Sequence, residues 1–236
     1  MKKIAEIFAL CCIALNAQAQ TITNEKELQQ RQAQIKQQLQ DESQGKHKFG
    51  QSCSQKGGAY VNSVCWATRN VSLPGTFADR PESAGMFYQW NSAVGWTSTD
   101  PLLNSNSATK WNTIMPDNSE WKGVNNPCPQ GWRVPTQGEL KSLLDDTKVQ
   151  NEWTTQNTVN GRKFTDKASR ASIFFPAAGS RNWKDGSLKD VGDFGCYWSS
   201  EQHNGLFSYY LYFFNKETHV SNFSRSAAQS VRCVAE

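Results

Sequence analysis

From residue 51 onward, the sequence predicts a domain of short strands and long ordered loops rather than a helical bundle. This part of the chain is rich in Trp, Gly, Asn and Ser, and short apolar runs alternate in it with turn-forming residues. Only one segment carries clear helix signals. The last third holds three aromatic or cysteine-containing segments in succession: GCYWSS (195–200), FSYYLYFF (207–214) and SVRCV (230–234).

The strands expected before the last third are short. Residues 61–71 are typical of a strand interrupted by polar residues, and residues 85–90 fit either a strand or a short helix. Residues 173–175 form an apolar strand that Pro176 stops. The Asn160-Gly161 dipeptide accepts the positive φ values of a tight turn, so it predicts a hairpin there.

The helix begins at a T-x-x-E capping box made by Thr136 and Glu139. Leu140, Leu143 and Leu144 follow at helical spacing and predict an apolar face that packs on a sheet. The polar residues after Leu144 predict that the helix ends near Lys148.

The first 19 residues have the pattern of a secretory signal peptide. Lys2 and Lys3 precede an apolar run over residues 7–15, and the small-x-small triplet 17–19 provides a cleavage site. A membrane anchor is the alternative, but the run is far shorter than the roughly 20 apolar residues that a spanning helix needs. We expect an exported chain, periplasmic, cell-surface or secreted, that begins at Gln20 and has no transmembrane segment.

Residues 20–50 form a separate, Gln-rich extension. Its regular apolar residues are Leu28, Ile35 and Leu39, a thin stripe that predicts a solvated helix leading into a flexible stretch. A coiled-coil stalk is the alternative, although fewer than three heptads are present. Residues 51–236 then form one globular domain.

The charge of the chain excludes a nucleic-acid surface. The formal net charge is +4, and it falls to about +3 once Lys2, Lys3 and Glu6 are removed with the signal segment. Nucleic-acid-binding domains show clustered Lys and Arg, whereas the basic residues here are dispersed.

Five cysteines remain after the signal segment, and in an oxidising compartment they are first candidates for disulfides. Cys53 and Cys65 flank the Gly57-Gly58 turn, which would bring them together. Cys128 and Cys233 would then join the middle of the domain to its last strand, leaving Cys196 as a buried free thiol, or else an intermolecular or reactive one. Five cysteines still allow several pairings.

The aromatic run 207–214 supplies the candidate binding surface. Strand alternation places Phe207, Tyr209, Leu211 and Phe213 on the face better suited to the core, and Ser208, Tyr210, Tyr212 and Phe214 on the other. Tyr combines a rigid ring with a hydroxyl, which suits protein or carbohydrate contact. The full set of candidate ligand-binding residues is Trp183, His203, Asn204, Tyr210, Tyr212, His219, Asn222, Phe223 and Arg225. The alternative is that a second layer of loops covers the tyrosines.

Six blocks in order carry a family resemblance. They are CWATRNV (65–71), GMFYQWN (85–91), NPCPQGWRVPTQGEL (126–140), SIFFPAAGSR (172–181), GCYWSS and SVRCV. Together, over residues 60–236, the sequence resembles the Fibrobacter succinogenes major paralogous domain family of exported bacterial domains. The resemblance implies an α+β fold similar to C-type lectins and to the formylglycine-generating enzyme superfamily, with a twisted antiparallel sheet, one or two helices and long loops. It also implies a role in binding or adhesion.

Most of the motif residues are expected to hold the fold together. Cys128 can link the chain covalently, Gly131 can allow close backbone approach, and Trp132 supplies a large apolar anchor. Arg133 can pair with a carboxylate or cap carbonyls. The same structural role is expected for Trp66, Trp90, Tyr197 and Trp198.

Metal and catalytic signals are weak. With three histidines and no C-x-x-C pair, a zinc site has little support, and we expect no cofactor, with calcium bound by Asp185, Asp190 or Asp193 as the alternative. Residues 116–118 (PDN) superficially resemble the calcium and sugar triplets of animal lectins, without their acidic partners. Oxidase chemistry of the superfamily would need an accessible thiolate, and Cys196 is the candidate.

The sequence therefore predicts a non-enzymatic, exported module that binds an unknown protein or glycan through residues 202–225 and adjoining loops. The alternative is a structural or assembly component of the envelope or of a surface polymer. A formylglycine-generating-type oxidase is the less favoured third reading, since no catalytic residues can be assigned from spacing.

Overall fold

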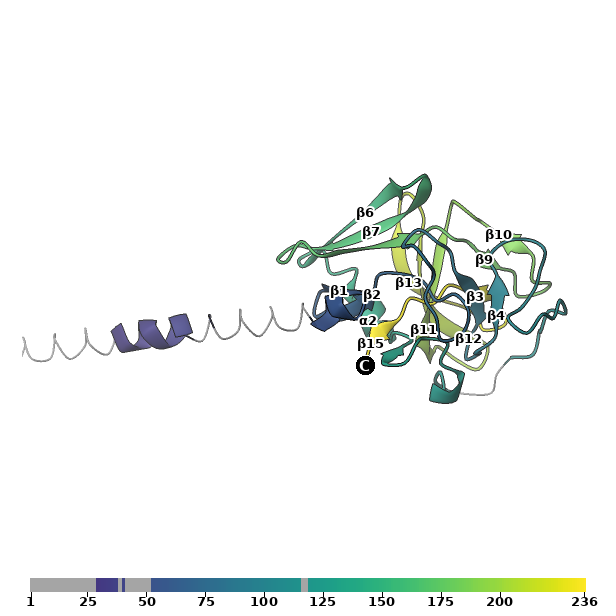
Figure 1. Ribbon diagram of the computed structural model, residues 1–236, viewed down its shortest axis with the longest axis horizontal. Coiled ribbons are helices and arrows are strands. Elements are labelled where there is room, and N and C mark those ends of the chain that lie inside the picture. The colour runs from purple at the N-terminus through teal and green to yellow at the C-terminus, as the bar shows by residue number, and fades with distance from the viewer. Residues whose placement is uncertain (1–28, 38–39, 41–51, 116–118) are drawn as a thin grey trace, which may run out of the picture. The chain divides into compact units, whose positions relative to one another are not determined.

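The computed structural model describes residues 29–37, 40, 52–115 and 119–236 (Figure 1). The chain divides into two compact units, Met1–Phe49 and Gly50–Glu236. In the first unit, residues 29–37 are helical and exposed, and 56% of Ile35 is accessible to solvent. The signal segment 1–19, most of the Gln-rich extension and the PDN triplet 116–118 lie outside the described residues.

The second unit is built almost entirely from short strands connected by loops and turns. Among its described residues, the helical elements are the 3-10 helix η1 (Gly123–Asn125), the six-residue helix α2 (Gln137–Ser142) and one helical turn at residues 52–55. The strands are β1 (Gly58–Val61), β2 (Val64–Ala67), β3 (Met86–Gln89), β4 (Gly95–Thr97), β5 (Trp132–Arg133), β6 (Val149–Gln156), β7 (Val159–Asp166), β8 (Ser172–Pro176), β9 (Ser180–Arg181), β10 (Leu188–Lys189), β11 (Gly195–Gln202), β12 (Phe207–Phe213), β13 (Thr218–Ser224), β14 (Ala228–Gln229) and β15 (Val234–Ala235).

These strands form four small antiparallel sheets, with the orders β1-β2-β15-β5, β10-β9-β14-β3-β4, β11-β12-β13 and β6-β7-β8 (Figure 1). The expectation of an α+β, C-type-lectin-like fold is therefore wrong, because the described domain is β-rich. Turn-forming residues interrupt the apolar runs every few positions, so most strands stay short and distribute among several sheets.

Helix α2 confirms the capping box. The Thr136 side chain accepts a hydrogen bond from the Glu139 amide at 3.1 Å, and the Glu139 carboxylate accepts one from the Thr136 amide at 2.7 Å. The helix ends at Ser142, earlier than the predicted end near Lys148. Leu140 and Leu143 are fully buried in the core. The apolar face of the helix is therefore packed even though the helix is little more than one turn long.

The hairpin prediction at Asn160-Gly161 is wrong by three residues. Strands β6 and β7 pair from Val149↔Asp166 to Gln156↔Val159, and Asn157 and Thr158 form the turn with φ values of 47° and 70°. Gly161 lies inside β7, where a Cβ would approach the Phe175 carbonyl oxygen to 2.3 Å. Glycine is needed at this position for close strand packing and not for a turn.

The remaining strand predictions agree with the structure in part. Residues 85–90 contain strand β3, and β8 runs to Pro176 as expected. Residues 61–71 are split, because Asn62 and Ser63 have positive φ and turn the chain from β1 into β2.

The described residues form three buried clusters, of which two are large. The first surrounds Trp66, Phe164, Phe175, Leu211 and Phe213, all fully buried, and includes the inner face of β11-β12. The second gathers Trp90, Trp121, Trp132 and Trp198 around the Cys128–Cys233 disulfide. Rings of this size account for a large share of the apolar area buried on folding.

The two predicted disulfides are both present. Cys53 bonds to Cys65 across a sequence separation of 12, and Cys128 bonds to Cys233 across a separation of 105. Cys196 is the free cysteine among the described residues.

The motif residues occupy structural positions. Trp66, Trp90, Tyr197 and Trp198 are fully buried. Arg133 forms a two-pronged pair with Glu139, at 2.6 and 2.8 Å. Gly131 differs from its predicted role, since a Cβ there would meet no atom within 4 Å. Its φ of +78° requires the glycine instead.

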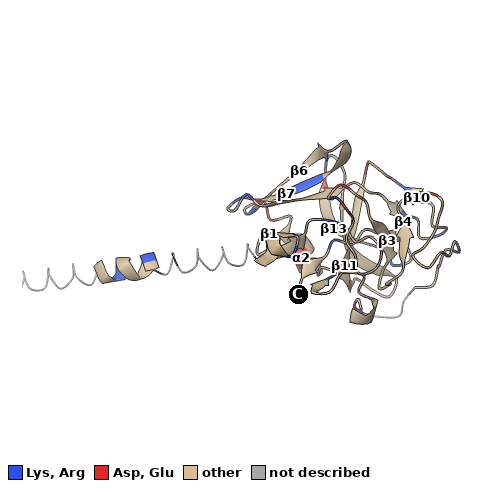
Figure 2. Ribbon diagram, viewed as in Figure 1, with Lys and Arg blue, Asp and Glu red and all other residues tan. Residues whose placement is uncertain are grey.

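Charged residues are spread over many strands and loops of the domain (Figure 2). Within the described residues, no helix combines the length and the apolar character needed to cross a membrane.

Candidate functional site on the aromatic sheet

The three-stranded sheet β11-β12-β13 has one face in the first core cluster, and its other face is covered only in part. Leu211 and Phe213 of β12 pack in the first core cluster, as the alternation predicts. Phe207 and Tyr209 share that alternation but lie beyond the core, and 36% of Phe207 is exposed. Tyr210 and Tyr212 therefore belong to the outer face, and so do the residues directly opposite them in the ladder.

The strand register shows which side chains join the two tyrosines. Tyr212 lies opposite His219 of β13 on one side and opposite Cys196 of β11 on the other. Tyr210 lies opposite Ser221 and Trp198, and Phe223 lies two residues beyond Ser221 on the same face of β13, opposite Ser208. Cross-strand neighbours on one face are close enough for their side chains to interact.

The rings on this outer face stack on one another. Tyr212 lies 5.8 Å from Tyr210 and 6.2 Å from Phe214 between ring centroids, with interplanar angles of 23° and 17°. Phe194, just before β11, stacks on Phe214 at 5.2 Å and on Tyr212 at 6.4 Å. These distances are in the range of offset-stacked aromatic pairs.

Strand β13 extends the cluster sideways. His219 lies 5.6 Å from Tyr212, and Phe223 lies 5.7 Å from Tyr210. We refer to the six residues Phe194, Tyr210, Tyr212, Phe214, His219 and Phe223 as the aromatic face. The sequence prediction missed Phe194, because it lies before its strand and only the fold brings it to Tyr212.

The aromatic face is buried at one end and open at the other. Tyr210 packs against the second core cluster beside the buried Trp198, and this burial raises the pKa of its phenol, which therefore remains a neutral hydroxyl. His219 and Phe223 are exposed, and Tyr212, Phe214 and Phe194 are half-buried. The alternative that loops cover the tyrosines completely does not hold in the described domain.

Four predicted ligand-binding residues meet on this face: Tyr210, Tyr212, His219 and Phe223. Asn222 does not, because it pairs with Tyr209 in the ladder and so belongs to the opposite face. His203 contacts the same Tyr209, with 3.1 Å between His203 Nδ1 and the phenol oxygen. Asn204 closes the turn before β12, where its Oδ1 accepts hydrogen bonds from the backbone amides of Leu206 and Phe207.

Arg225 is buried, so it does not lie on the surface on which the sequence placed it. It is 1% exposed, its guanidinium lies 4.0 Å from the Trp90 ring centroid, and Nη1 donates to the Gly205 carbonyl at 3.0 Å. A buried arginine of this kind packs the loop against the core and does not face a ligand.

Trp183 belongs to another sheet. It lies in the loop between β9 and β10, 48% exposed, and its carbonyl accepts a hydrogen bond from the indole of Trp111. The exposure fits the predicted aromatic platform, but the residue does not take part in the stacked rings of the aromatic face.

The loop 184–193, which carries the Asp residues of the predicted calcium alternative, contains no metal-binding group. Asp185 accepts hydrogen bonds from the amide and hydroxyl of Ser187, which lower the pKa of its carboxyl. No group of three or more His, Cys, Asp or Glu residues that could hold a metal ion occurs in the described part of the chain.

Cys196 lies on the outer face opposite Tyr212, but its chemistry is unfavourable for a nucleophile. Burial of the thiol raises its pKa to about 12, and the charge of Asp190 adds to the effect. Because the thiolate is the reactive species, the folded chain holds very little of it at neutral pH.

We therefore expect iodoacetamide to label Cys196 at pH 8 about a thousandfold more slowly in the folded chain than in the urea-unfolded chain. Mass spectrometry of quenched samples measures both rates, and the Cys196→Ser variant identifies the signal. Equal rates in the two states would mean that the thiol is accessible and reactive.

Comparison with known proteins places the chain in a family. It matches the Fibrobacter succinogenes major domain over residues 10–235. A search of curated proteins finds no match, and a search of solved structures finds none either. Because the matched residues cover nearly the whole sequence, this chain belongs to the Fibrobacter succinogenes major domain family.

Proposed function

We propose that the protein is an exported, non-enzymatic binding module that recognises a protein ligand through the aromatic face. The observation that carries this proposal is the continuous stack of half-exposed rings on the outer side of β11-β12-β13. Exposed apolar patches rimmed by polar groups are typical of interaction surfaces. Here the rim consists of the Tyr212 hydroxyl, the His219 imidazole and Ser221.

The orientation of the rings favours a protein over a glycan. Tyr212 has a near-parallel ring on either side, so its π faces are partly covered by Tyr210 and Phe214. What remains for a partner is ring edges and hydroxyl tips. Sugar stacking needs an open ring face, whereas apolar and hydrogen-bonding side chains of a protein can pack against edges.

Preorganisation supports a binding role as well. The rings hold one another in place before any ligand arrives, so little side-chain freedom is lost on association. Interface energy concentrates in a few aromatic anchors of this kind.

Two competing functions differ in their physical requirements. An oxidase working through Cys196 would need a lowered thiol pKa, and burial has the opposite effect. An assembly role would use the aromatic face for contacts between copies of the chain, which predicts self-association that depends on the same rings.

The test is the double variant Tyr212→Ser/Phe223→Ser, compared with parent for binding to a protein extract of the cell envelope by biolayer interferometry. We expect at least about a tenfold loss of affinity, since two anchors of about 1 kcal/mol or more each are removed. The part of the parent's signal that this variant loses should disappear after protease treatment of the extract and should persist after periodate oxidation of its sugars.

The matched control is Val124→Ser/Leu206→Ser, which removes two exposed apolar side chains outside the aromatic face, 87% and 57% exposed. Its affinity should equal that of the parent. Unchanged binding by the folded Tyr212→Ser/Phe223→Ser variant would refute the aromatic face. Periodate sensitivity of the part of the signal that this variant loses would refute a protein ligand. Concentration-dependent sedimentation of the pure chain, lost in the same variant, would favour assembly.

A further inference from the structure

A second site is suggested by a pocket in another part of the domain. It has a volume of about 640 Å³ and lies between the loop 78–85, the residues after β4, the tip of the β6-β7 hairpin and the segment 176–178. Its volume is within the roughly 300–1,000 Å³ typical of small-molecule sites. None of the aromatic-face residues lines it.

The lining mixes polar groups with small apolar side chains and carries no positive charge. Asp79 and Glu82 contribute carboxylates, Ser98 and Thr99 contribute hydroxyls, and Asn160 contributes an amide, while no Lys or Arg lines the pocket. An anionic ligand such as a phosphate would meet two carboxylates without a cation to balance them. The pocket therefore disfavours anions. Because Asp79 is exposed to solvent and Glu82 already accepts hydrogen bonds from two side-chain amides, neither carboxylate needs a cation to balance it, and a neutral ligand with several hydrogen-bond donors fits.

Glu82 is held in place as an acceptor. Its Oε1 accepts hydrogen bonds from the Gln156 and Asn157 side-chain amides, the second at 2.8 Å, and these residues lie at the end of the hairpin. The bond from Gln156 is the main cause that lowers the pKa of the Glu82 carboxyl, so the group is charged although it is buried. A carboxylate has about four acceptor sites, so capacity for a ligand hydroxyl remains.

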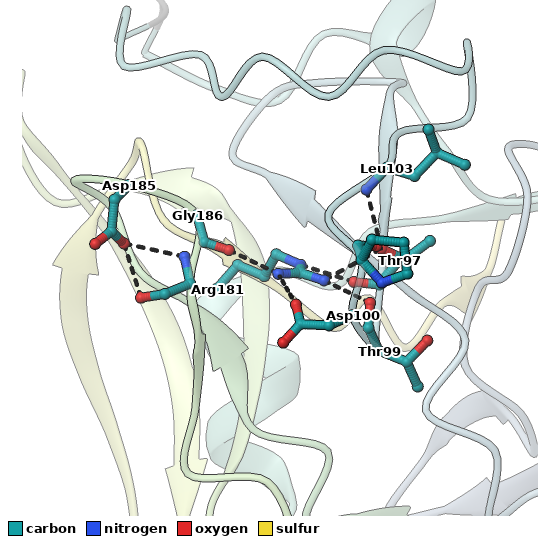
Figure 3. A network of polar contacts seen from close by, with 9 residues as sticks. Thr97, Thr99, Asp100, Leu103, Arg181, Asp185 and Gly186 are labelled. Carbon is teal, nitrogen blue, oxygen red and sulfur yellow. Dashed lines mark hydrogen bonds and ion pairs between the residues drawn. The ribbon is translucent and has the colours of Figure 1, made fainter.

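The wall that carries Ser98 and Thr99 is fixed by a fully buried arginine. Arg181 donates to the Thr97 carbonyl at 2.8 Å, to the Thr99 carbonyl at 2.7 Å and to the Gly186 carbonyl at 2.7 Å (Figure 3). Asp100 adds a 3.3 Å ion pair from its exposed position. The Thr99 backbone is thereby held, while its side chain is exposed at the pocket.

The opposite wall is fixed by a second buried network. The Tyr197 hydroxyl donates to the Pro176 carbonyl at 2.8 Å, and Asn70 Nδ2 donates to the Ala84 carbonyl at 3.0 Å. Both accepting residues line the pocket. Rigid walls of this kind reduce the ordering cost of binding a small ligand.

Apolar patches complete the lining. Val159 and Val191, together with Pro176 and the adjacent alanines, offer C–H surface between the polar groups. A pyranose ring has the matching pattern of hydroxyls around an apolar carbon face. Donors would go to the carboxylates and the carbon face would lie on the aliphatic side chains.

We propose that this pocket binds a neutral saccharide unit, separately from the protein ligand of the aromatic face. The inference does not depend on the proposed function, because the two sites share no residue. It also assigns a role to the SIFFPAAGSR block, which supplies Pro176, Ala177 and Ala178 on one wall and Arg181 behind the other.

The test begins with a glycan array of neutral and acidic glycans, probed with the purified, labelled chain, and continues with calorimetric titration of the best neutral glycan. Thr99→Arg places a long cationic side chain at the pocket from an exposed position and leaves the backbone contact of Arg181 intact. We expect this variant to weaken binding at least about tenfold. Glu82→Gln keeps its shape and should lose about tenfold or more, since bonds to charged acceptors are the stronger ones.

The matched control is Thr113→Arg, the same substitution at an exposed residue that does not line the pocket. It should bind like the parent, and so should Tyr212→Ser/Phe223→Ser, which separates this result from the test of the aromatic face. The proposal is overturned if no neutral glycan binds, if only acidic glycans bind, or if folded Thr99→Arg and Thr113→Arg bind equally.

Discussion

Replacing Cys128 and Cys233 together with serine should lower the free energy of unfolding by about 4.7 kcal/mol. The disulfide closes a loop with a sequence separation of 105, so its loss gives the unfolded chain far more conformational freedom. The bond also lies within the second core cluster, among Trp132, Trp198 and Val231, where its loss leaves packing space. Guanidinium denaturation followed by tryptophan fluorescence measures the change.

The matched comparison is the Cys53→Ser/Cys65→Ser variant. That disulfide closes a loop with a separation of only 12, so the expected loss is about 3 kcal/mol. Both measurements use the Cys196→Ser background, which prevents new pairings with the free thiol. Equal losses for the two disulfides would show that loop length does not govern their stabilisation here.

The second large effect is expected at Arg232, which is fully buried and forms no ion pair with a described residue. Its guanidinium donates twice to Asn70 Oδ1, at 2.8 and 2.9 Å, and also to the carbonyls of Ala67 and Phe174. It lies 4.4 Å from the Phe175 ring centroid. Arg232→Met should lower the free energy of unfolding by about 3 kcal/mol or more, because buried acceptors lose their donors.

Arg232→Lys is the informative control. It keeps the charge but replaces the planar fork with one ammonium group, which cannot serve three separate acceptors in the same geometry. Its stability should fall between those of the parent and Arg232→Met in urea denaturation. If Arg232→Met is as stable as the parent, relief of the buried charge offsets the lost hydrogen bonds, as occurs for some buried ion pairs.

The burial of Arg232 makes the free energy of unfolding depend on pH in a predictable direction. Desolvation lowers the pKa of its guanidinium to about 10, below the value in the unfolded chain. Folding therefore disfavours the charged form of Arg232. Below pH 10 this lowers the free energy of unfolding by its full amount, and the free energy of unfolding rises as the pH increases through 10 and the folded chain loses the proton. At neutral pH the group is charged, so its hydrogen bonds offset a desolvation cost.

Local patterns predicted the features that depend on a few neighbouring residues. The capping box at Thr136 and Glu139, the strand that ends at Pro176 and the Gly57-Gly58 turn between Cys53 and Cys65 involve interactions within about a dozen positions. The alternation in β12 correctly placed Leu211 and Phe213 in the core. The Cys128–Cys233 pair was predictable because few cysteines remained.

Features that depend on long-range packing were predicted poorly. The α+β expectation failed because the number and pairing of strands are set by contacts between distant segments, such as β14 beside β3 and β9. Arg225 is charged and follows a polar strand, which is typical of a surface residue, yet its guanidinium is buried against the indole of Trp90. Gly161 had the signature of a turn, yet close contact with β8 requires it inside a strand.

The sequence alone predicted the two disulfides of the domain and showed a surplus of aromatic rings in its last third. Only the tertiary structure decided which rings meet, since Phe194, Tyr212 and His219 come from three segments that a sheet register aligns. The same holds for the polar pocket, whose lining comes from loops up to 120 positions apart. Covalent and local interactions are readable from neighbouring residues, whereas surfaces and cavities arise from packing that no local pattern encodes.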